Sequence, residues 1–239
     1  PVVLLHGYTD SCRSFEPVLA HLPKSVRAFA LTQRGHGDAD RPADGYRPED
    51  LANDLASWMD FAGLRSAVIV GHSMGAHVAQ RLAIDHSERV RGLVLVGAFR
   101  ELASNAAIRE LEADVARLSD PVDASFVRAF QQSTVHQLLP PTFLDMVVGE
   151  SLKVPHRVWK AALDGLIGSD LSPERFRIAR PTLLVWGTAD ALVPRGDQEA
   201  LLATISSSDL LEYSAAGHAT HWDEPERFAV DLTAFVRRL

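Results

Sequence analysis

Six short apolar runs recur along the chain, and they predict buried β-strands. Each run is continuous rather than alternating, and Gly, Pro or charged residues bound it. Strands that are buried on both faces of a parallel sheet have this pattern. The six predicted strands are Val2–Leu5, Val26–Leu31, Ala67–Val70, Gly92–Val96, Thr182–Trp186 and Asp209–Tyr213.

Apolar residues at helical spacing fill most of the segments between these runs. In Pro48–Ala62, for example, Leu51, Leu55 and Met59 recur on what would be one face of a helix. The predicted helices are Phe15–Leu22, Pro48–Ala62, Met74–His86, Gln198–Ile205 and Glu226–Leu239. The alternation of strand and helix predicts an α/β fold with a doubly wound, mostly parallel sheet, in which the loops after the strands meet along one edge.

The alternation stops between Phe99 and Arg180, where helical patterns separated by prolines replace it. The four predicted helices of this segment are Ala106–Leu118, Ala124–Gln132, Pro141–Leu152 and Pro155–Ile167. We therefore expect a core formed by residues 1–98 and 179–239, with an inserted helical cap, residues 99–178, over the carboxyl edge of the sheet. Because the first residue opens directly into a strand, we also expect the core to be truncated at its N-terminus.

Composition narrows the classes of function. The chain has 239 residues and a net charge of −7 without a basic run, which argues against nucleic-acid binding. It has no apolar run long enough to span a bilayer and no visible signal peptide. Its single cysteine, Cys12, excludes an intrachain disulfide and fits a reducing compartment. These features predict a cytoplasmic protein and leave its oligomeric state open.

The most informative motif is the run Gly-His-Ser-Met-Gly at residues 71–75, which joins a predicted strand to a predicted helix. In that context the G-x-S-x-G pattern places a serine on a sharp turn with its hydroxyl exposed. The flanking glycines allow the backbone to pass closely. Ser73 is therefore the candidate nucleophile, and the alternative is a turn that only joins strand to helix.

A serine hydroxyl needs a base to take its proton. His218 lies in the loop after the last predicted strand, at the same sheet edge as Ser73. His221 is the competing candidate. Together with Asp223 these histidines could also suggest a metal cluster, but no further ligands with the spacing of a zinc site are present, so we expect no metal.

The base in turn needs a carboxylate to fix its tautomer. Asp190 follows the predicted strand Thr182–Trp186, and the apolar segment Ala191–Pro194 could shield it. The alternative is a solvated aspartate that caps the next helix. A second location would follow Gly92–Val96, but the first acid there is the more distant Glu101. The sequence therefore favours Asp190.

The turn after the first strand offers a site for a developing negative charge. Gly7 would let a substrate oxygen approach the backbone, and the N–H groups of Tyr8 and Met74 are the candidate oxyanion-hole donors. Removal of one such donor typically costs about 100- to 1000-fold in rate. His6 is interpreted as structural.

Together these motifs resemble those of the α/β-hydrolase superfamily. The resemblance rests on His6-Gly7, Arg34-Gly35-His36-Gly37, the serine elbow, Trp186–Asp190 and Gly217–Trp222, with the chemistry in the order Ser, Asp, His. It implies that Ser73 is the nucleophile, His218 the base and Asp190 the acid that orients it. It also implies structural roles for Arg34 and His36. The core of this family normally begins with further strands, and the sequence departs from the family in lacking them.

Dehalogenases and epoxide hydrolases of this fold carry an aspartate at the elbow, so Ser73 favours acyl chemistry. We expect a hydrolase of a small-molecule carboxylic ester or lactone that forms an acyl-enzyme and needs no cofactor. Alternatives with the same triad are a perhydrolase and a C–C bond hydrolase, for which Arg100, Arg157 and Lys160 could bind a dicarboxylate. A ligand receptor without turnover is a further alternative. Candidate pocket residues of the cap are Phe99, Phe130, Leu139, Phe143, Trp159 and Leu166.

Overall fold

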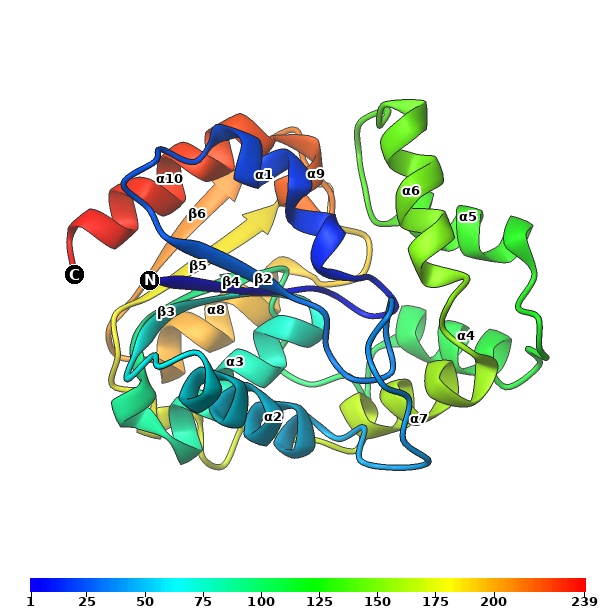
Figure 1. Cartoon of the computed structure of the whole chain (residues 1–239), viewed down its shortest axis with the longest axis horizontal. Helices are drawn as coiled ribbons and strands as arrows, with labels where there is room; N and C mark the ends of the chain where they lie inside the picture. Colours follow the sequence, from blue (N-terminus) through cyan, green and yellow to red (C-terminus); the bar gives the residue numbers. More distant parts are fainter.

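A six-stranded sheet forms the centre of the computed structural model, which describes all 239 residues (Figure 1). The strand order is β2-β1-β3-β4-β5-β6, and every neighbouring pair is parallel. The strands are β1 (Val2–Leu5), β2 (Ala28–Leu31), β3 (Ala67–His72), β4 (Val90–Val96), β5 (Thr182–Gly187) and β6 (Ser208–Tyr213). The predicted doubly wound α/β sheet is confirmed, and it is parallel throughout.

Burial along the strands explains why their sequences read as continuous apolar runs. Every residue of β1, β3 and β5 is buried, because helices cover both faces of these inner strands. The strands at the two edges of the sheet, β2 and β6, are mostly half-buried. The polar and charged residues of β6 therefore fit its position at an edge.

Helices cover both faces of the sheet, as Figure 1 shows. One face carries α1 (Glu16–His21) and α10 (Pro225–Arg237), and the other carries α2 (Pro48–Phe61), α3 (Met74–Asp85) and α8 (Arg195–Thr204). These bounds agree with the predicted helices to within a few residues. The prediction missed three short 3-10 helices, Cys12–Phe15, Ser87–Arg89 and Arg175–Arg177, and the one-turn helix α9 (Thr220–Asp223). No helix combines the length and the apolar character that crossing a membrane would require.

Four helices lie between β4 and β5, and we call them the insert helices. They are α4 (Ala106–Val115), α5 (Ala124–Ser133), α6 (Pro141–Ser151) and α7 (His156–Ile167). They gather at one side of the sheet, toward which the arrows of β5 and β6 point (Figure 1). Val147 and Trp159 of these helices belong to the same hydrophobic cluster as Leu5 and Ile69 of the sheet. The apolar core therefore runs without a break from the sheet into the insert helices.

Candidate active site

Ser73 sits on a strained turn between β3 and α3. Its backbone has φ 50° and ψ −110°, a conformation that an L-residue adopts only at a cost of about 1–3 kcal/mol. A Cβ on Gly71 would lie 2.2 Å from the carbonyl oxygen of Gly75, and a Cβ on Gly75 would lie 2.3 Å from that of Leu5. Both glycines are therefore required. The Ser73 N–H donates to the carbonyl of Val96 at 2.9 Å, which ties the turn to the neighbouring strand.

His218 and Asp190 form a hydrogen-bonded pair beside this turn. The His218 Nδ1 lies 2.8 Å from Asp190 Oδ2. The other carboxylate oxygen, Oδ1, accepts from the N–H groups of Leu192 and Val193 at 2.8 and 2.9 Å. The Asp190 side chain is wholly buried, so these bonds replace its water. When Nδ1 donates its proton to this carboxylate, the Nε2 lone pair of neutral His218 is left free.

A glycine at the end of β4 makes room for the histidine. Gly97 has a φ of +56°, and a Cβ at this position would lie 2.9 Å from the His218 ring. A larger residue would therefore displace the imidazole that pairs with Asp190.

The turn after β1 brings a second strand end to the same place. A Cβ on Gly7 would lie 2.6 Å from His72 Nδ1, so only glycine fits against the serine turn. No hydrogen bond of the turns and loops uses the N–H of Tyr8 or Met74 as donor. Both donors are therefore available to a bound group.

The three residues that follow Gly7 each reach a different insert helix. The Tyr8 hydroxyl donates to the Trp159 carbonyl of α7 at 2.5 Å. Thr9, which has a φ of 65°, places its hydroxyl 3.4 Å from the Ser151 hydroxyl of α6. Asp10 Oδ1 accepts a hydrogen bond from Gln131 Nε2 of α5. The position of this turn therefore depends on three separate helices.

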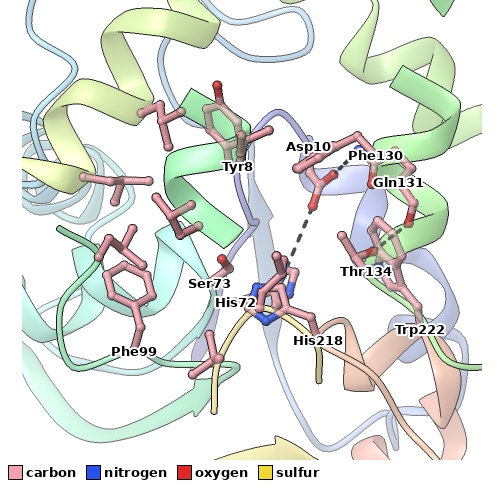
Figure 2. Close-up of a pocket in the computed structure, with 17 residues that line it drawn as sticks. Tyr8, Asp10, His72, Ser73, Phe99, Phe130, Gln131, Thr134, His218 and Trp222 are labelled. Carbon is pink, nitrogen blue, oxygen red and sulfur yellow. Dashed lines mark hydrogen bonds and ion pairs between the residues drawn. The ribbon is translucent and has the colours of Figure 1, made fainter. Parts of the chain in front are cut away.

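Ser73 and His218 line one pocket, together with mostly apolar side chains. The other polar residues of its wall are Asp10, His72, Gln131 and Thr134. No arginine or lysine lines it. Figure 2 shows Phe99 with other apolar side chains to one side of Ser73, and Asp10, Gln131 and Thr134 to the other. The pocket therefore has an apolar side and a side that carries hydrogen-bonding groups.

Half of the predicted pocket residues of the insert lie elsewhere. Phe99, Phe130 and Leu166 line the pocket, whereas Leu139, Phe143 and Trp159 do not. Trp159 is fully buried behind the wall, with its ring edge-to-face against Tyr8 at 5.3 Å and Phe130 at 5.5 Å.

Phe143 packs edge-to-face on Trp222 at 5.5 Å, and Leu139 is half-buried against the main cluster. Helical spacing indicates which residues are buried, but it does not separate those at a cavity from those behind it.

The three basic residues considered for a dicarboxylate are engaged away from the pocket. The Arg157 guanidinium donates to two backbone carbonyls of the loop before α2 at 2.8 and 2.7 Å. Lys160 Nζ lies 2.7 Å from Asp164 Oδ2, and an Arg100 guanidinium nitrogen lies 3.6 Å from Glu101. The charge that a dianionic substrate would need is therefore absent from the pocket wall.

His221 and Asp223 occupy structural surroundings. The His221 ring packs between Phe15 at 4.9 Å and His72 at 4.6 Å, and neither ring nitrogen has a hydrogen-bond partner. Burial lowers the pKa of His221 to about 3.

Asp223 accepts hydrogen bonds from the N–H groups of Gly217, His136 and Gln137 at 2.7, 3.0 and 2.8 Å. The Ala219 N–H also donates to the Thr134 carbonyl at 2.7 Å. These bonds hold the loop that carries His218 against the end of α5.

The residues predicted to be structural also lie outside the pocket wall. His6 donates from Nδ1 to a neighbouring carbonyl at 2.8 Å, and its Nε2 accepts from the Gln33 N–H at 2.9 Å. Arg34 forms an ion pair with Asp54 at 2.5 Å, and His36 Nδ1 donates to the Arg34 carbonyl at 2.8 Å. All three residues stabilise the loop that follows β2.

Asp10 is a pocket residue that the sequence reasoning missed. Its side chain is 4% exposed, and burial raises its pKa to about 7. Its Oδ1 accepts from Gln131 Nε2 at 2.9 Å, and its Oδ2 lies 3.9 Å from His72 Nδ1. The signal available in the sequence was an acid three residues after Gly7, at a strand end that already carried candidate chemistry.

Comparison with known proteins gives matches over most of the chain. A family model described as alpha/beta hydrolase fold matches residues 1–225. The pimeloyl-[acyl-carrier protein] methyl ester esterase of Neisseria meningitidis serogroup B is 29% identical over 245 residues, which cover 98% of this chain and 92% of that protein. The 2-hydroxy-6-oxononadienedioate/2-hydroxy-6-oxononatrienedioate hydrolase of Burkholderia vietnamiensis is 28% identical over 258 residues, 99% of this chain and 87% of that one.

Among solved structures, the esterase EaEST from Exiguobacterium antarcticum has a TM-score of 0.90 to this chain at 24% identity. The match covers 99% of this chain and 91% of that one. The two chains therefore share one fold.

Proposed function

The chain belongs to the α/β-hydrolase fold family, and on that premise we propose that it cleaves a carboxylic ester or lactone through an acyl-enzyme on Ser73. One observation carries the proposal. Ser73, on its strained turn, shares a pocket with a histidine whose Nδ1 bonds a buried carboxylate. A serine, a histidine and a buried carboxylate that orients the histidine are the three groups of the catalytic triad.

The proposed reaction begins when His218 Nε2 takes the Ser73 proton and Oγ attacks the substrate carbonyl carbon. Asp190 holds the Nδ1–H tautomer and stabilises the imidazolium that forms. The N–H groups of Tyr8 and Met74 donate to the oxyanion. The tetrahedral intermediate collapses, the C–O bond breaks, and the alcohol leaves with the proton from His218.

Deacylation repeats these steps with water. His218 takes a proton from the water, the hydroxide adds to the acyl carbon, and the carboxylic acid leaves as Ser73 regains its proton. All the proton transfers use one imidazole, so this proposal needs no metal or cofactor.

The charge of the pocket wall favours esters over one class of C–C bond substrate. The Burkholderia vietnamiensis relative is named for a dioate, a molecule with two carboxylates. Here the wall contains the acid Asp10 and no arginine or lysine. A dianion would therefore find no cationic partner on the wall, and burying its charges unpaired would cost free energy. A neutral ester carries no charge and avoids this cost.

The test is a burst assay with p-nitrophenyl acetate and p-nitrophenyl butyrate on the wild type and on Ser73→Ala. We expect nitrophenol release in the wild type and its loss in the variant. Ser14→Ala is the matched control, because Ser14 is buried, lies outside the pocket wall and has an unpaired hydroxyl. Parallel assays with a vinylogous diketone and with peroxide plus acetate test the C–C bond hydrolase and perhydrolase alternatives.

Equal nitrophenol release by the wild type and Ser73→Ala would exclude the acyl-enzyme mechanism. A folded wild type that shows ligand binding but no turnover of any substrate would instead favour a receptor.

A further inference from the structure

Asp10 places a carboxyl group inside the proposed substrate pocket, on the side opposite Phe99 (Figure 2). An acid that is 4% exposed is costly unless its oxygens are hydrogen-bonded. The proposed acyl-enzyme reaction does not use this group. Hydrolysis at Ser73 alone therefore does not explain a carboxyl group at the pocket wall.

Only one of the two Asp10 oxygens accepts a hydrogen bond from a side chain. Oδ1 accepts from Gln131 Nε2 at 2.9 Å, and the same nitrogen donates to the Ser151 hydroxyl at 2.7 Å. Oδ2 lies 3.9 Å from His72 Nδ1, which is too far for a hydrogen bond. Both ring nitrogens of His72 are buried without partners. The structure thus leaves Oδ2 at the pocket wall without a hydrogen bond from any side chain.

The neighbouring groups add a second acceptor but no cation. The Thr134 hydroxyl donates its proton to the Gln131 carbonyl at 2.7 Å, so its lone pairs remain available on the pocket wall. The remainder of the pocket is mostly apolar. A ligand that pairs with the ionised form of Asp10 must therefore bring a hydrogen-bond donor.

We propose that Asp10 is a specificity-determining residue, whose Oδ2 accepts a hydrogen bond from a hydroxyl group on the substrate. The substrate class is an ester in which one arm is hydrocarbon and the other carries a hydroxyl. The hydrocarbon arm packs on the side of Phe99, and Ser73 reaches the carbonyl between the two arms. This inference rests on the proposed function and refines it.

The expected discrimination follows from the burial of Asp10. A site built to hydrogen-bond a substrate group rejects analogues that lack it, because its buried polar atom is then left unpaired. Above pH 7, where Asp10 is mostly ionised, a hydrogen bond to this charged group contributes enough to change kcat/KM by about tenfold or more. We expect at least that preference for the hydroxylated ester.

The test compares three small esters on one enzyme preparation. Ethyl butyrate lacks a hydroxyl, 2-hydroxyethyl butyrate carries one on the alcohol arm, and ethyl 3-hydroxybutyrate carries one on the acyl arm. The readout is the ratio of kcat/KM for each hydroxylated ester to that for ethyl butyrate. In the wild type one of the two ratios should be about 10 or larger.

Asp10→Leu removes the acceptor, and the preferred ratio should then fall toward 1. Asp10→Asn keeps one acceptor oxygen without the charge, so its kcat/KM ratio should lie between those of the wild type and Asp10→Leu. It replaces Asp10→Leu as the test if the leucine variant does not fold. Phe130→Leu is the matched control on the pocket wall. It removes an aromatic ring but no acceptor, so it should preserve the ratio.

Two results would overturn the role of Asp10. One is a wild type whose ratios are both near 1, and the other is a preference that both Asp10 variants retain. Either result, with turnover of ethyl butyrate still dependent on Ser73, leaves the proposed function in place. Ester turnover that survives Ser73→Ala would instead reject the proposed function itself.

Discussion

Five buried histidines whose pKa is lowered should make this protein sensitive to mild acid. Burial lowers the pKa of His6, His77 and His221 to about 3 and that of His36 to about 4, and it holds the pKa of His72 well below its ordinary value. In the unfolded chain each would titrate near 6.5. In His6 a further feature opposes protonation, because its Nε2 already accepts a hydrogen bond from the Gln33 N–H.

These lowered pKa values determine how the free energy of unfolding changes with pH. A histidine whose folded pKa is lowered contributes stability above pH 6.5, and that contribution is lost as the pH falls. Between pH 7.5 and pH 5.5 each of the five lowers the free energy of unfolding by about 1–2 kcal/mol, or by about 7 kcal/mol together.

Asp10 changes the free energy of unfolding in the opposite direction as the pH falls. Its pKa is raised to about 7, so it regains about 2 kcal/mol over the same interval. The net loss of about 5 kcal/mol is comparable with the whole stability of many domains.

The assay is urea unfolding at pH 7.5, 6.5 and 5.5, followed by tryptophan fluorescence. His221→Phe is the informative variant, because neither nitrogen of His221 has a partner and its ring packs against Phe15 and Phe228. We expect the loss of unfolding free energy over the interval to be about 1–2 kcal/mol smaller in this variant. His21→Gln is the control, because His21 is exposed.

An unfolding free energy that is the same at pH 7.5 and 5.5 would refute the reasoning. So would a pH dependence of His221→Phe that matches the wild type.

Three further predictions concern the proposed chemistry and its supports. Asp190→Asn should lower kcat for p-nitrophenyl butyrate by about 1000-fold or more, because the amide no longer fixes the His218 tautomer; a loss under tenfold would contradict its role. Gly75→Ala should cost about 3 kcal/mol or more in urea unfolding, since its Cβ would lie 2.3 Å from the Leu5 carbonyl, and wild-type stability would contradict that clash. Asp223→Ala should reduce kcat more than it raises KM, because three N–H groups lose their acceptor and the loop that carries His218 is released. Unchanged kinetics would indicate that other contacts hold this loop.

The sequence predicts the sheet well because burial on both faces imposes continuous apolar runs. The six strand predictions agree with the structure to within two residues at each end. The order of strands and helices then places the loops with Ser73, Asp190 and His218 at one edge, through the handedness of the crossovers. Glycines at positions 71 and 75 mark the serine turn, since a side chain at either would overlap the backbone.

The residues that line the pocket are harder to predict from the sequence. Phe130 and Trp159 have the same apolar character and helical setting, yet only Phe130 reaches the cavity. Gln131 looks like an ordinary polar position on a helix, and its bond to Asp10 joins residues 121 positions apart. Such contacts depend on how the insert helices dock, which local patterns do not encode.

The bonds from Tyr8, Thr9 and Asp10 to three insert helices also have a consequence for protein engineering. Grafting the insert of a relative onto this core would replace the partners of all three residues at once. The chimera would then lose the bonds that position the turn of Tyr8, Thr9 and Asp10. A chimera that retains the Trp159 carbonyl, Ser151 and Gln131 should tolerate new residues elsewhere in the graft. Any exchange of the insert therefore has to preserve these three positions.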